Sequence, residues 1–350
     1  MTSGRRGILT AGTWCVDYNR TVSHWPGEDG LAELFEEERH GGGSGCNLAV
    51  DIKLLDPAIP VETIALVGDD DDGRFLMATA TAAGIDTRQM KTTGGAATQF
   101  CDAFVSRATH RRTHIFHAGT GALLTPEHFD FSETRMRILH LGLPGVHRIL
   151  DSPWQDEPNG WVAVLKKARV AGLLTNMELA SIEQNLMAAL VAPCLPHLDY
   201  LIVNDVEIGA IAGIETALAG TPDRNACIRA AQAVMQRGAM KLVAVHCPGF
   251  AIAVTRDGEH TVLPSVAIPE SEIQGANGAG DAFAAGMIYG LHEEWTISQS
   301  LQLAHAAAAA SLRSISTTGA IVPWRECLSL AKTWGVRAPG GDGLLPAGAH

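Results

Sequence analysis

The sequence at residues 273–281 reads IQGANGAGD and continues directly into an apolar helical pattern at residues 282–291. Glycines allow a tight turn and a close approach to a ligand, because they have no Cβ atom. A helix that begins here would direct unpaired N–H groups and the positive end of its dipole at an anion. Asp281 lies at the same end, so a general base and a phosphate site could meet at one substrate oxygen, as phosphoryl transfer requires. The alternative is that Asp281 only caps its helix and the glycines only turn the chain.

Composition and charge narrow the class of protein. The 350 residues are 46% hydrophobic and 18% charged, which is typical of one large α/β domain or two small ones. The net charge of −12 argues against nucleic-acid and membrane partners. No apolar run approaches 18 residues and the start shows no signal core. Seven scattered cysteines without a CxxC pair indicate a reduced, cytoplasmic protein without a zinc ribbon.

Strand-like and helix-like segments alternate along most of the chain. Strands are expected at 7–16, 61–68, 137–142, 170–175, 199–203 and 241–246, and helices at 47–55, 74–83, 159–169, 179–192, 223–237, 297–314 and from Trp324. This rhythm predicts an α/β fold whose central, mostly parallel sheet is covered on both faces. Residues 250–266 read as a hairpin that turns at Asp257-Gly258.

Three segments depart from that rhythm. Residues 17–45 are polar and irregular and end in a glycine run that could be a ligand mouth or a hinge. Residues 96–118 alternate like a hairpin, which predicts a small sheet over a site, and spacing indicates no metal role for its histidines. The four acids at 69–72 could suggest a metal site, but calcium loops place other residues between their acids. Capping of the following helix is therefore the preferred interpretation.

Several well-known motifs are missing. The chain contains no GxxxxGK[ST] loop, no protein-kinase signature set, no HExxH and no GxSxG. The glycine run at 41–45 does not form GxGxxG after a strand, so dinucleotide binding has little support. These absences leave a phosphoryl-transfer site of another type as the leading hypothesis.

Five spaced motifs carry a family resemblance. They are the first strand with Asp17, the run Gly42-Gly43-Ser44-Gly45-Cys46-Asn47, the run Val67-Gly68-Asp69-Asp70 with Gly73, the run Asn204-Asp205-Val206-Glu207, and Gly278-Ala279-Gly280-Asp281. In this order, from Gly12 to about Trp324, the chain resembles the ribokinase, or PfkB-type, carbohydrate kinase family. The resemblance implies a three-layer α/β/α kinase domain over 1–337, a lid from about 17–41 and 96–118, and a flexible tail at 338–350.

The resemblance also implies site roles. Asp281 would be the catalytic base, and Gly278, Ala279 and Gly280 the anion hole. Asp17, Gly42, Gly43 and Asn47 would bind the substrate hydroxyls. Asn204 and Glu207, an NxxE motif, would serve ATP and Mg²⁺, with Glu207 reaching the metal through water; Gly249 and His305 would lie beside the nucleotide. The NxxE pair alone could equally be a helix capping box, and His305 an ordinary packing residue.

The chain departs from the family pattern at three places. Gly275 and Ala276 stand where the family has an acid and a hydroxylic residue, which weakens the case for a monovalent cation. The nucleotide loop His246-Cys247-Pro248-Gly249 keeps only its last glycine. Residues 141–144 lack the acid with which ribokinases contact sugar, and this weighs against ribose.

The resulting hypothesis is ATP-dependent phosphorylation of a primary hydroxyl on a sugar or sugar-like molecule, by a homodimer that pairs through its lid. A nucleoside kinase is the nearer rival, with Trp14, Trp25 and Phe116 as stacking surfaces. A non-catalytic ligand sensor is the more distant one. Arg107, Arg111 and Arg112 are the candidates for a second phosphate site, and a solvated turn explains them equally well.

Overall fold

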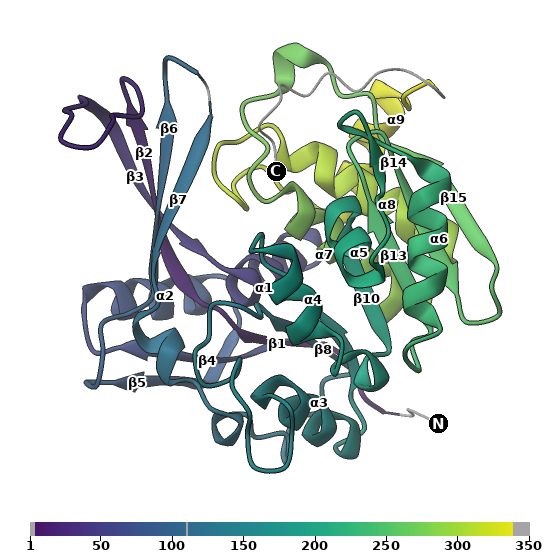
Figure 1. The fold of residues 1–350 in the computed structure, drawn as a ribbon, viewed down its shortest axis with the longest axis horizontal. Helices are drawn as coiled ribbons and strands as arrows, with labels where there is room; N and C mark the ends of the chain where they lie inside the picture. Colours follow the sequence, from purple (N-terminus) through teal and green to yellow (C-terminus); the bar gives the residue numbers. More distant parts are fainter. Residues whose placement is uncertain (1–3, 110, 339–350) are drawn as a thin grey trace.

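The computed structural model describes residues 4–109 and 111–338, in which a nine-stranded sheet separates two layers of helices (Figure 1). In spatial order its strands are β15 (His260–Pro264), β14 (Phe250–Thr255), β13 (Leu242–His246), β10 (Tyr200–Asn204), β9 (Leu174–Met177), β8 (Ile138–Gly142), β1 (Ile8–Gly12), β4 (Val61–Gly68) and β5 (Asp86–Thr93). The strands from β13 to β5 run parallel, whereas β14 and β15 form an antiparallel edge. The predicted mostly parallel sheet is confirmed.

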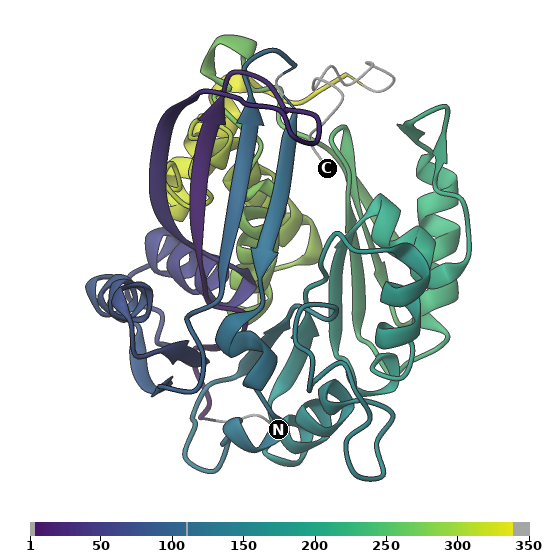
Figure 2. The same cartoon turned by 60° about the vertical axis from the view of Figure 1, so that its left-hand side comes forward.

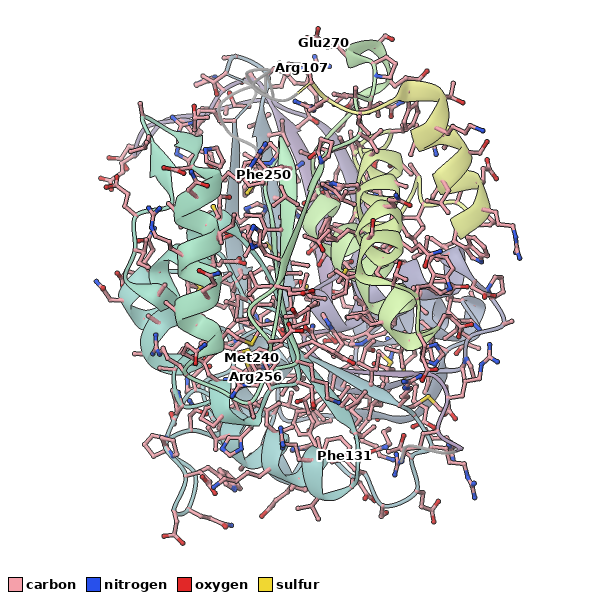
Figure 3. All side chains as sticks on the ribbon, turned by 90° about the vertical axis from the view of Figure 1, so that its right-hand side faces the viewer. Arg107, Phe131, Met240, Phe250, Arg256 and Glu270 are labelled. Carbon is pink, nitrogen blue, oxygen red and sulfur yellow. The ribbon has the colours of Figure 1, made fainter. Side chains whose placement is uncertain are left out.

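Helices cover both faces of this sheet. The helices are α1 (Ser44–Leu55), α2 (Asp71–Ala82), α3 (Gly160–Val170), α4 (Gln184–Val191), α5 (Asp205–Ala212), α6 (Arg224–Met235), α7 (Ala279–His292), α8 (Ile297–Ser311) and α9 (Trp324–Trp334). Short 3₁₀ turns lie at Gly119–Leu123, Pro126–His128, Leu195–His197 and Glu270–Glu272, and a two-stranded ribbon joins β11 (Ala217–Leu218) to β12 (Thr221–Pro222). Seen from the side, the yellow-green helices α8 and α9 and the teal-green helix α6 lie on opposite sides of the strands (Figure 3). None of the helices in the described ranges is long and apolar enough to cross a membrane.

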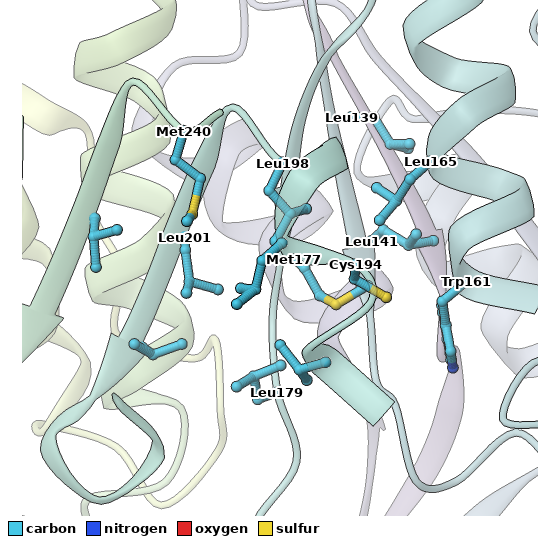
Figure 4. Packing of buried hydrophobic residues seen from close by; sticks show 14 of the residues in the cluster. Leu139, Leu141, Trp161, Leu165, Met177, Leu179, Cys194, Leu198, Leu201 and Met240 are labelled. Carbon is cyan, nitrogen blue, oxygen red and sulfur yellow. The ribbon is translucent and has the colours of Figure 1, made fainter. Parts of the chain in front are cut away.

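Two hydrophobic cores explain why these strands form the centre of the molecule. Successive strand side chains point to opposite faces, so Leu201 and Val203 enter the core under α3–α6, while Tyr200 and Ile202 enter the core under α1, α2 and α7–α9. Figure 4 shows the first of these cores, where Trp161 of α3 packs near Leu141 of β8. Because both faces of the sheet are buried, its strands are nearly continuous apolar runs.

A second, four-stranded sheet stands apart from the main one (Figure 2). Its strands, in spatial order, are β3 (Leu34–Gly42), β2 (Cys15–Val22), β6 (Phe100–Ser106) and β7 (Arg112–His117). The outer pairs are antiparallel and the central β2–β6 pair is parallel. The small sheet expected from residues 96–118 is therefore present, and residues 15–42 complete it. We call this sheet the lid.

The single strand expected at 7–16 is wrong in extent. The chain leaves the main sheet at Gly12, whose φ of 109° favours glycine and whose Cβ would overlap the Gly142 carbonyl oxygen. Strand β2 then begins at Cys15 in the lid. Residues 17–45, expected to be irregular, form most of β2 and β3, because lid strands that are largely open to solvent carry polar residues on both faces.

The acid run at 69–72 caps a helix, as preferred above. The Asp70 side chain accepts hydrogen bonds from the Gly73 amide (2.8 Å) and from the Thr98 amide (2.7 Å). These bonds fix the start of α2 and tie it to the segment that enters the lid. Across the described ranges no group of three or more metal-ligating side chains is present. The tail predicted from residue 338 lies outside the described residues, apart from Ala338.

Candidate active site

The start of α7 forms an anion-binding turn. Gly278 precedes the helix with φ 76°, in the left-handed region, and a Cβ there would overlap the Thr317 carbonyl oxygen. A side chain at this position would meet both backbone strain and a steric clash. Among the described residues, no acceptor takes the amide protons of Gly280 and Asp281. The sequence IQGANGAGD therefore produces free N–H groups at a helix start.

Asp281 is the carboxylate at this turn, in the first turn of α7. Its Oδ2 accepts a hydrogen bond from Asn47 Nδ2 of α1 at 3.1 Å, and Thr317 Oγ1 donates to Asn47 Oδ1 at 3.1 Å. Burial raises the pKa of Asp281 well above its ordinary value, and the neighbouring Glu178 carboxyl raises it further. Asn47 thus links α1 to the predicted catalytic base.

The predicted acceptor-binding residues lie on this side of Asp281. Asp17 is on β2 of the lid, and burial together with the charge of Asp281 raises its pKa to about 6. A Cβ at Gly42 would overlap the Asp17 carboxylate, so this glycine makes room for that side chain. Gly43 adopts φ 83° and packs on Thr13. The structure brings these four residues together around the Asn47–Asp281 contact.

A cavity of about 340 Å³ lies on the other side of the turn. The predicted residues that line it are Asn204, Glu207, Gly278, Ala279, Gly280, Asp281 and His305. Gly249 is not among the described lining residues; its loop contributes His246, Cys247 and Pro248 instead. The cavity therefore joins the anion-binding turn to most of the predicted nucleotide residues.

The NxxE pair is both a helix cap and part of the cavity wall. Asn204 Oδ1 accepts from the Glu207 amide at 2.8 Å, and Glu207 Oε2 accepts from the Asn204 amide at 2.9 Å. This reciprocal arrangement is a capping box at the start of α5. Burial raises the pKa of Glu207 to about 7. The two interpretations of the motif are thus compatible.

The far end of the cavity is aromatic and largely uncharged. Phe283 of α7 lies between His246 (ring centres 5.0 Å apart) and His305 (5.4 Å). Burial lowers the pKa of both histidines to about 4, so both rings are neutral at pH 7. Arg337, which sequence reasoning missed, also lines the cavity. Its backbone amide donates to the Ser265 carbonyl, which holds the segment after α9 against the cavity.

Glu178 is the most important residue that sequence reasoning missed. It follows the last residue of β9 and lines the cavity together with Asp281, whose pKa it raises. The family's acid was expected in the stretch 141–144 after the adjacent strand; at Gly142 of that stretch, a Cβ would lie 2.7 Å from Ser44 Oγ and 3.1 Å from the Glu178 carbonyl oxygen. The sequence signal that could have revealed Glu178 is an acid directly after a parallel strand, where such sheets bind ligands.

The segment before the turn bonds to the chain itself. The amides of Gln274 and Gly275 both donate to the Leu312 carbonyl, at 2.8 and 3.2 Å. Gly275 brings no side-chain oxygen to this place. A monovalent cation at this segment therefore gains no support from the local contacts.

Asp51 is a buried acid one helical turn beyond Asn47. It is 0% exposed, and neither carboxyl oxygen has a hydrogen-bond partner among the described residues. Burial raises its pKa well above the ordinary value, and the charges of Asp281 and Glu178 act in the same direction. An ionised, unpaired carboxylate in this position opposes folding.

Replacing Asp51 with asparagine is expected to stabilise the protein more at pH 8.5 than at pH 5.5, by about 1–3 kcal/mol. With a raised pKa in the folded state, the unfolded chain releases this proton first, so stability falls as pH rises above the ordinary aspartate value. Thermal unfolding at both pH values measures the difference, with the exposed Glu272→Gln as the control. An equal shift at both pH values would contradict the prediction.

The mostly parallel sheet, the lid and the anion-binding turn beside a buried carboxylate define an α/β phosphotransferase. The chain belongs to the pfkB family carbohydrate kinases, because it matches the model of that family over residues 6–325. It is 26% identical to a 5-dehydro-2-deoxygluconokinase of Geobacillus kaustophilus over 90% of each chain. It is 24% identical to an ATP-dependent ribose-1-phosphate kinase of Halopiger xanaduensis, over 86% of this chain and 90% of the relative.

Solved structures show the same fold. The ribokinase of Arabidopsis thaliana, complexed with ribose and ATP, superposes with a TM-score of 0.74 at 17% identity, over 94% of this chain and 99% of that one. The ribokinase of Thermotoga maritima gives a TM-score of 0.73 at 19% identity, over 93% and 99%. The predicted ribokinase-like three-layer fold with a lid is confirmed.

Proposed function

We propose that this carbohydrate kinase transfers the γ-phosphoryl group of ATP to a primary hydroxyl of a sugar or sugar-like molecule. The observation that carries the proposal is the position of the Asp281 carboxylate in the first turn of α7. It lies beside the free backbone amides of Gly280 and of Asp281 itself, and it accepts a hydrogen bond from Asn47. A base and an anion hole thus face one point from the same turn, as in-line phosphoryl transfer requires.

In this mechanism Asp281 removes the proton of the acceptor hydroxyl as its oxygen attacks the γ-phosphorus. The bond from phosphorus to the bridging oxygen of ADP breaks. The free amide of Gly280, in the predicted anion hole at 278–280, and that of Asp281 stabilise the charge on the phosphoryl oxygens, whereas the Ala279 amide donates to the Ala276 carbonyl. Asp17, Gly42, Gly43 and Asn47 orient the acceptor from the lid and α1. Closure of the lid would exclude water that could otherwise hydrolyse ATP.

The residues of the cavity fit magnesium bound through phosphates and water. Mg²⁺ prefers oxygen ligands and keeps several waters when it binds a nucleotide, so it needs few protein ligands. The wall offers carboxylates at Glu207 and Glu178 and no three-residue metal cluster within the described ranges. Glu207, whose Oε2 serves the capping box, would hold the ion through water. When bound, Mg²⁺ would neutralise charge on the phosphates.

Gly249, His305 and Asn204 would bind the nucleotide, together with Arg337. The neutral histidines and Phe283, whose ring is inclined at 38° to His246 and at 76° to His305, form a weakly polar, aromatic wall for the base of the nucleotide. Dependence on a monovalent cation is not part of this proposal, since Gly275 brings no side-chain oxygen to this segment.

The nucleoside alternative loses part of its basis. Trp14 is 1% exposed and its Nε1 donates to Thr63 Oγ1 at 2.8 Å, so it is a core residue and offers no face to a base. Trp25 contacts Phe104 in the lid, while Phe116 is 52% exposed and shares the lid face of Asp17 through the pairs Asp17–Cys101 and Cys101–Phe116. Phe116 is the remaining stacking candidate.

The acceptor class also depends on the lid cations. Arg107 lies over the Phe35 ring, 4.1 Å from its centre, and pairs with Glu36, as a solvated turn would. Arg112 is half-buried, and its charge lowers the pKa of Asp17, so it faces the acceptor side. Because two relatives are named 5-dehydro-2-deoxygluconokinase, sugar-acid derivatives should be tested beside neutral sugars.

We also infer a cytoplasmic homodimer. All seven cysteines are free, which suits a reducing compartment. Leu34 and Ile115 are exposed on the lid face that points away from Asp17, which offers apolar surface to a second lid. Analytical ultracentrifugation over a range of concentrations tests this, and a monomer throughout would contradict it.

The proposed function is tested by ADP formation with Mg²⁺ and ATP over a panel of sugars, sugar acids, polyols and nucleosides. One acceptor class with turnover supports the proposal and names the acceptor. Turnover with nucleosides alone would favour the rival kinase. ATP binding without turnover on any acceptor would favour a ligand sensor.

A further inference from the structure

Arg112 of β7 is a half-buried cation without a partner. Its Nε atom is buried and has no hydrogen-bond partner, and its guanidinium forms no ion pair with any described residue. The other two arginines of the lid strands differ, since Arg20 pairs with Glu37 at 2.7 Å and Arg39 pairs with Asp72. Arginine stays charged at physiological pH, so an unpaired guanidinium in this position costs free energy.

The strand register places Arg112 on the lid face of Asp17. Through β6, Arg112 is in register with Thr21, which lies four residues after Asp17 on β2, and every second residue of a strand shares a face. The positive charge of Arg112 acts to lower the pKa of Asp17 and that of Cys101, which lies opposite Asp17. Four strand residues span about 13 Å, and the guanidinium extends along part of this distance toward Asp17.

Asn19 adds a second donor on the same face. Its Nδ2 atom is buried and has no hydrogen-bond partner among the described residues. Asn19 lies two residues after Asp17 on β2, and between it and β7 lies Ala103, which is 2% exposed and adds no polar side-chain group. An amide NH₂ and a guanidinium both donate hydrogen bonds. The face beyond Asp17 therefore carries two buried donors that lack an acceptor.

The other acids of this face have partners of their own. The Glu38 carboxylate lies 2.9 Å from the Nε2 atom of His40. Glu36 pairs with Arg107 near the tip of the lid. Asp17 remains, but it forms no ion pair with the guanidinium and belongs to the predicted sites for acceptor hydroxyls. Within the described ranges, the chain supplies no anion to the two donors.

We propose that Arg112 and Asn19 form a subsite for a carboxylate of the acceptor, so that the substrate of this kinase is a sugar acid. The proposal rests on the proposed function. Strand β2 leaves the main sheet at Cys15, so the two donors lie farther along the lid than Asp17 (Figure 2). The carboxylate binds at this end, and the primary hydroxyl at the other end of the carbon chain faces Asp281.

The charge of the subsite favours a carboxylate over a phosphate ester. A guanidinium binds the two oxygens of a carboxylate through two parallel N–H bonds, and one positive charge balances one negative charge. A phosphate ester carries close to two negative charges at pH 7. The neighbouring cations do not supply the second positive charge, because Arg107 is paired with Glu36 and Arg111 is exposed.

Arg112→Gln separates recognition of the carboxylate from general effects. In this variant kcat/KM for a sugar acid such as gluconate should fall by about 10- to 100-fold, mostly through KM, the usual effect of losing a hydrogen bond to a charged group. For the matched polyol, sorbitol, the change should stay below about threefold. Asn19→Ala should cost about 3- to 10-fold with the acid alone. Arg111→Gln removes the same charge from the exposed neighbour and should follow wild type.

Thermal unfolding supplies a readout that does not depend on turnover. Hexonic acids and their keto derivatives should raise the Tm of wild type and of Arg111→Gln, but not that of Arg112→Gln. Without ligand, Arg112→Gln should be at least as stable as wild type, because the substitution removes an unpaired, half-buried cation. An arginine with a purely structural role would instead lower the Tm when it is replaced.

Four outcomes would overturn the proposal. The first is a neutral molecule as the best acceptor of wild type, and the second is a preference for sugar phosphates such as glucose 6-phosphate over sugar acids. The third is an equal loss with gluconate and sorbitol in Arg112→Gln. The fourth is the absence of a Tm rise with every sugar acid. If wild type turns over no acceptor, the proposed function fails, whereas the Tm comparison still tests the subsite.

Discussion

Replacing Asp281 with asparagine is expected to lower kcat by about 10²- to 10⁴-fold, the range for loss of a general base. Asparagine keeps the shape of the side chain and can still face Asn47, but it cannot accept the hydroxyl proton. The folded protein should not suffer, because the substitution removes one member of a buried carboxyl pair whose ionised forms repel. ADP release at saturating acceptor measures kcat, and thermal unfolding measures stability.

The control for this prediction is Asp71→Asn. Asp71 is also in the first turn of a helix, but its side chain is 90% exposed and pairs only with Arg74. The kcat of Asp71→Asn should equal that of the wild-type protein. Near-normal turnover in Asp281→Asn would remove Asp281 from the role of base, and a comparable loss in both variants would point to a general effect of charge.

The parts of the fold that are buried on both sides could be predicted from the sequence. Residues 199–203 and 241–246 are short apolar runs between helical segments, and they became β10 and β13 with shifts of one residue. Strand β5 was missed because it is an edge strand with the sequence DTRQMKTT, in which only Met90 is buried. The lid strands were partly missed for the same reason, since exposed strands lack the apolar run.

The residues of the candidate site also fall into those that could be predicted from the sequence and those that could not. Asp281 and the glycines before it could be predicted because one local turn places them together, and the capping geometry of Asn204 and Glu207 follows from i,i+3 spacing. The contact of Glu178 with His140 of β8 (Oε2 to Nε2, 2.8 Å) could not, because it depends on how β8 lies beside β9. A contact between two separate elements has no characteristic residue spacing by which it could be recognised in the sequence.

Gly278→Ala is expected to lower kcat by about 10²- to 10³-fold, the usual effect of losing an oxyanion-hole donor. The new Cβ would overlap the Thr317 carbonyl oxygen and lie 2.7 Å from Thr317 Cα. Thr317 also donates to Asn47, which in turn contacts Asp281, so its displacement would disturb the amides and the base together. Steady-state kinetics with varied ATP and acceptor measures the effect.

Gly213→Ala separates this effect from simple backbone strain. Gly213 ends α5 with φ 69°, close to the 76° of Gly278, but a Cβ there meets no atom within 4 Å. Gly213→Ala should lower the stability by about 1–2 kcal/mol, because alanine is disfavoured in the left-handed backbone region, and its kcat should be unchanged. If the two alanine variants lose equal stability and both keep wild-type kcat, the turn before α7 does not hold the transferred phosphoryl group. A selective kcat loss in Gly278→Ala would place the turn before α7, with the Thr317–Asn47–Asp281 contacts that it supports, in the catalytic site, because backbone strain is matched between the two variants.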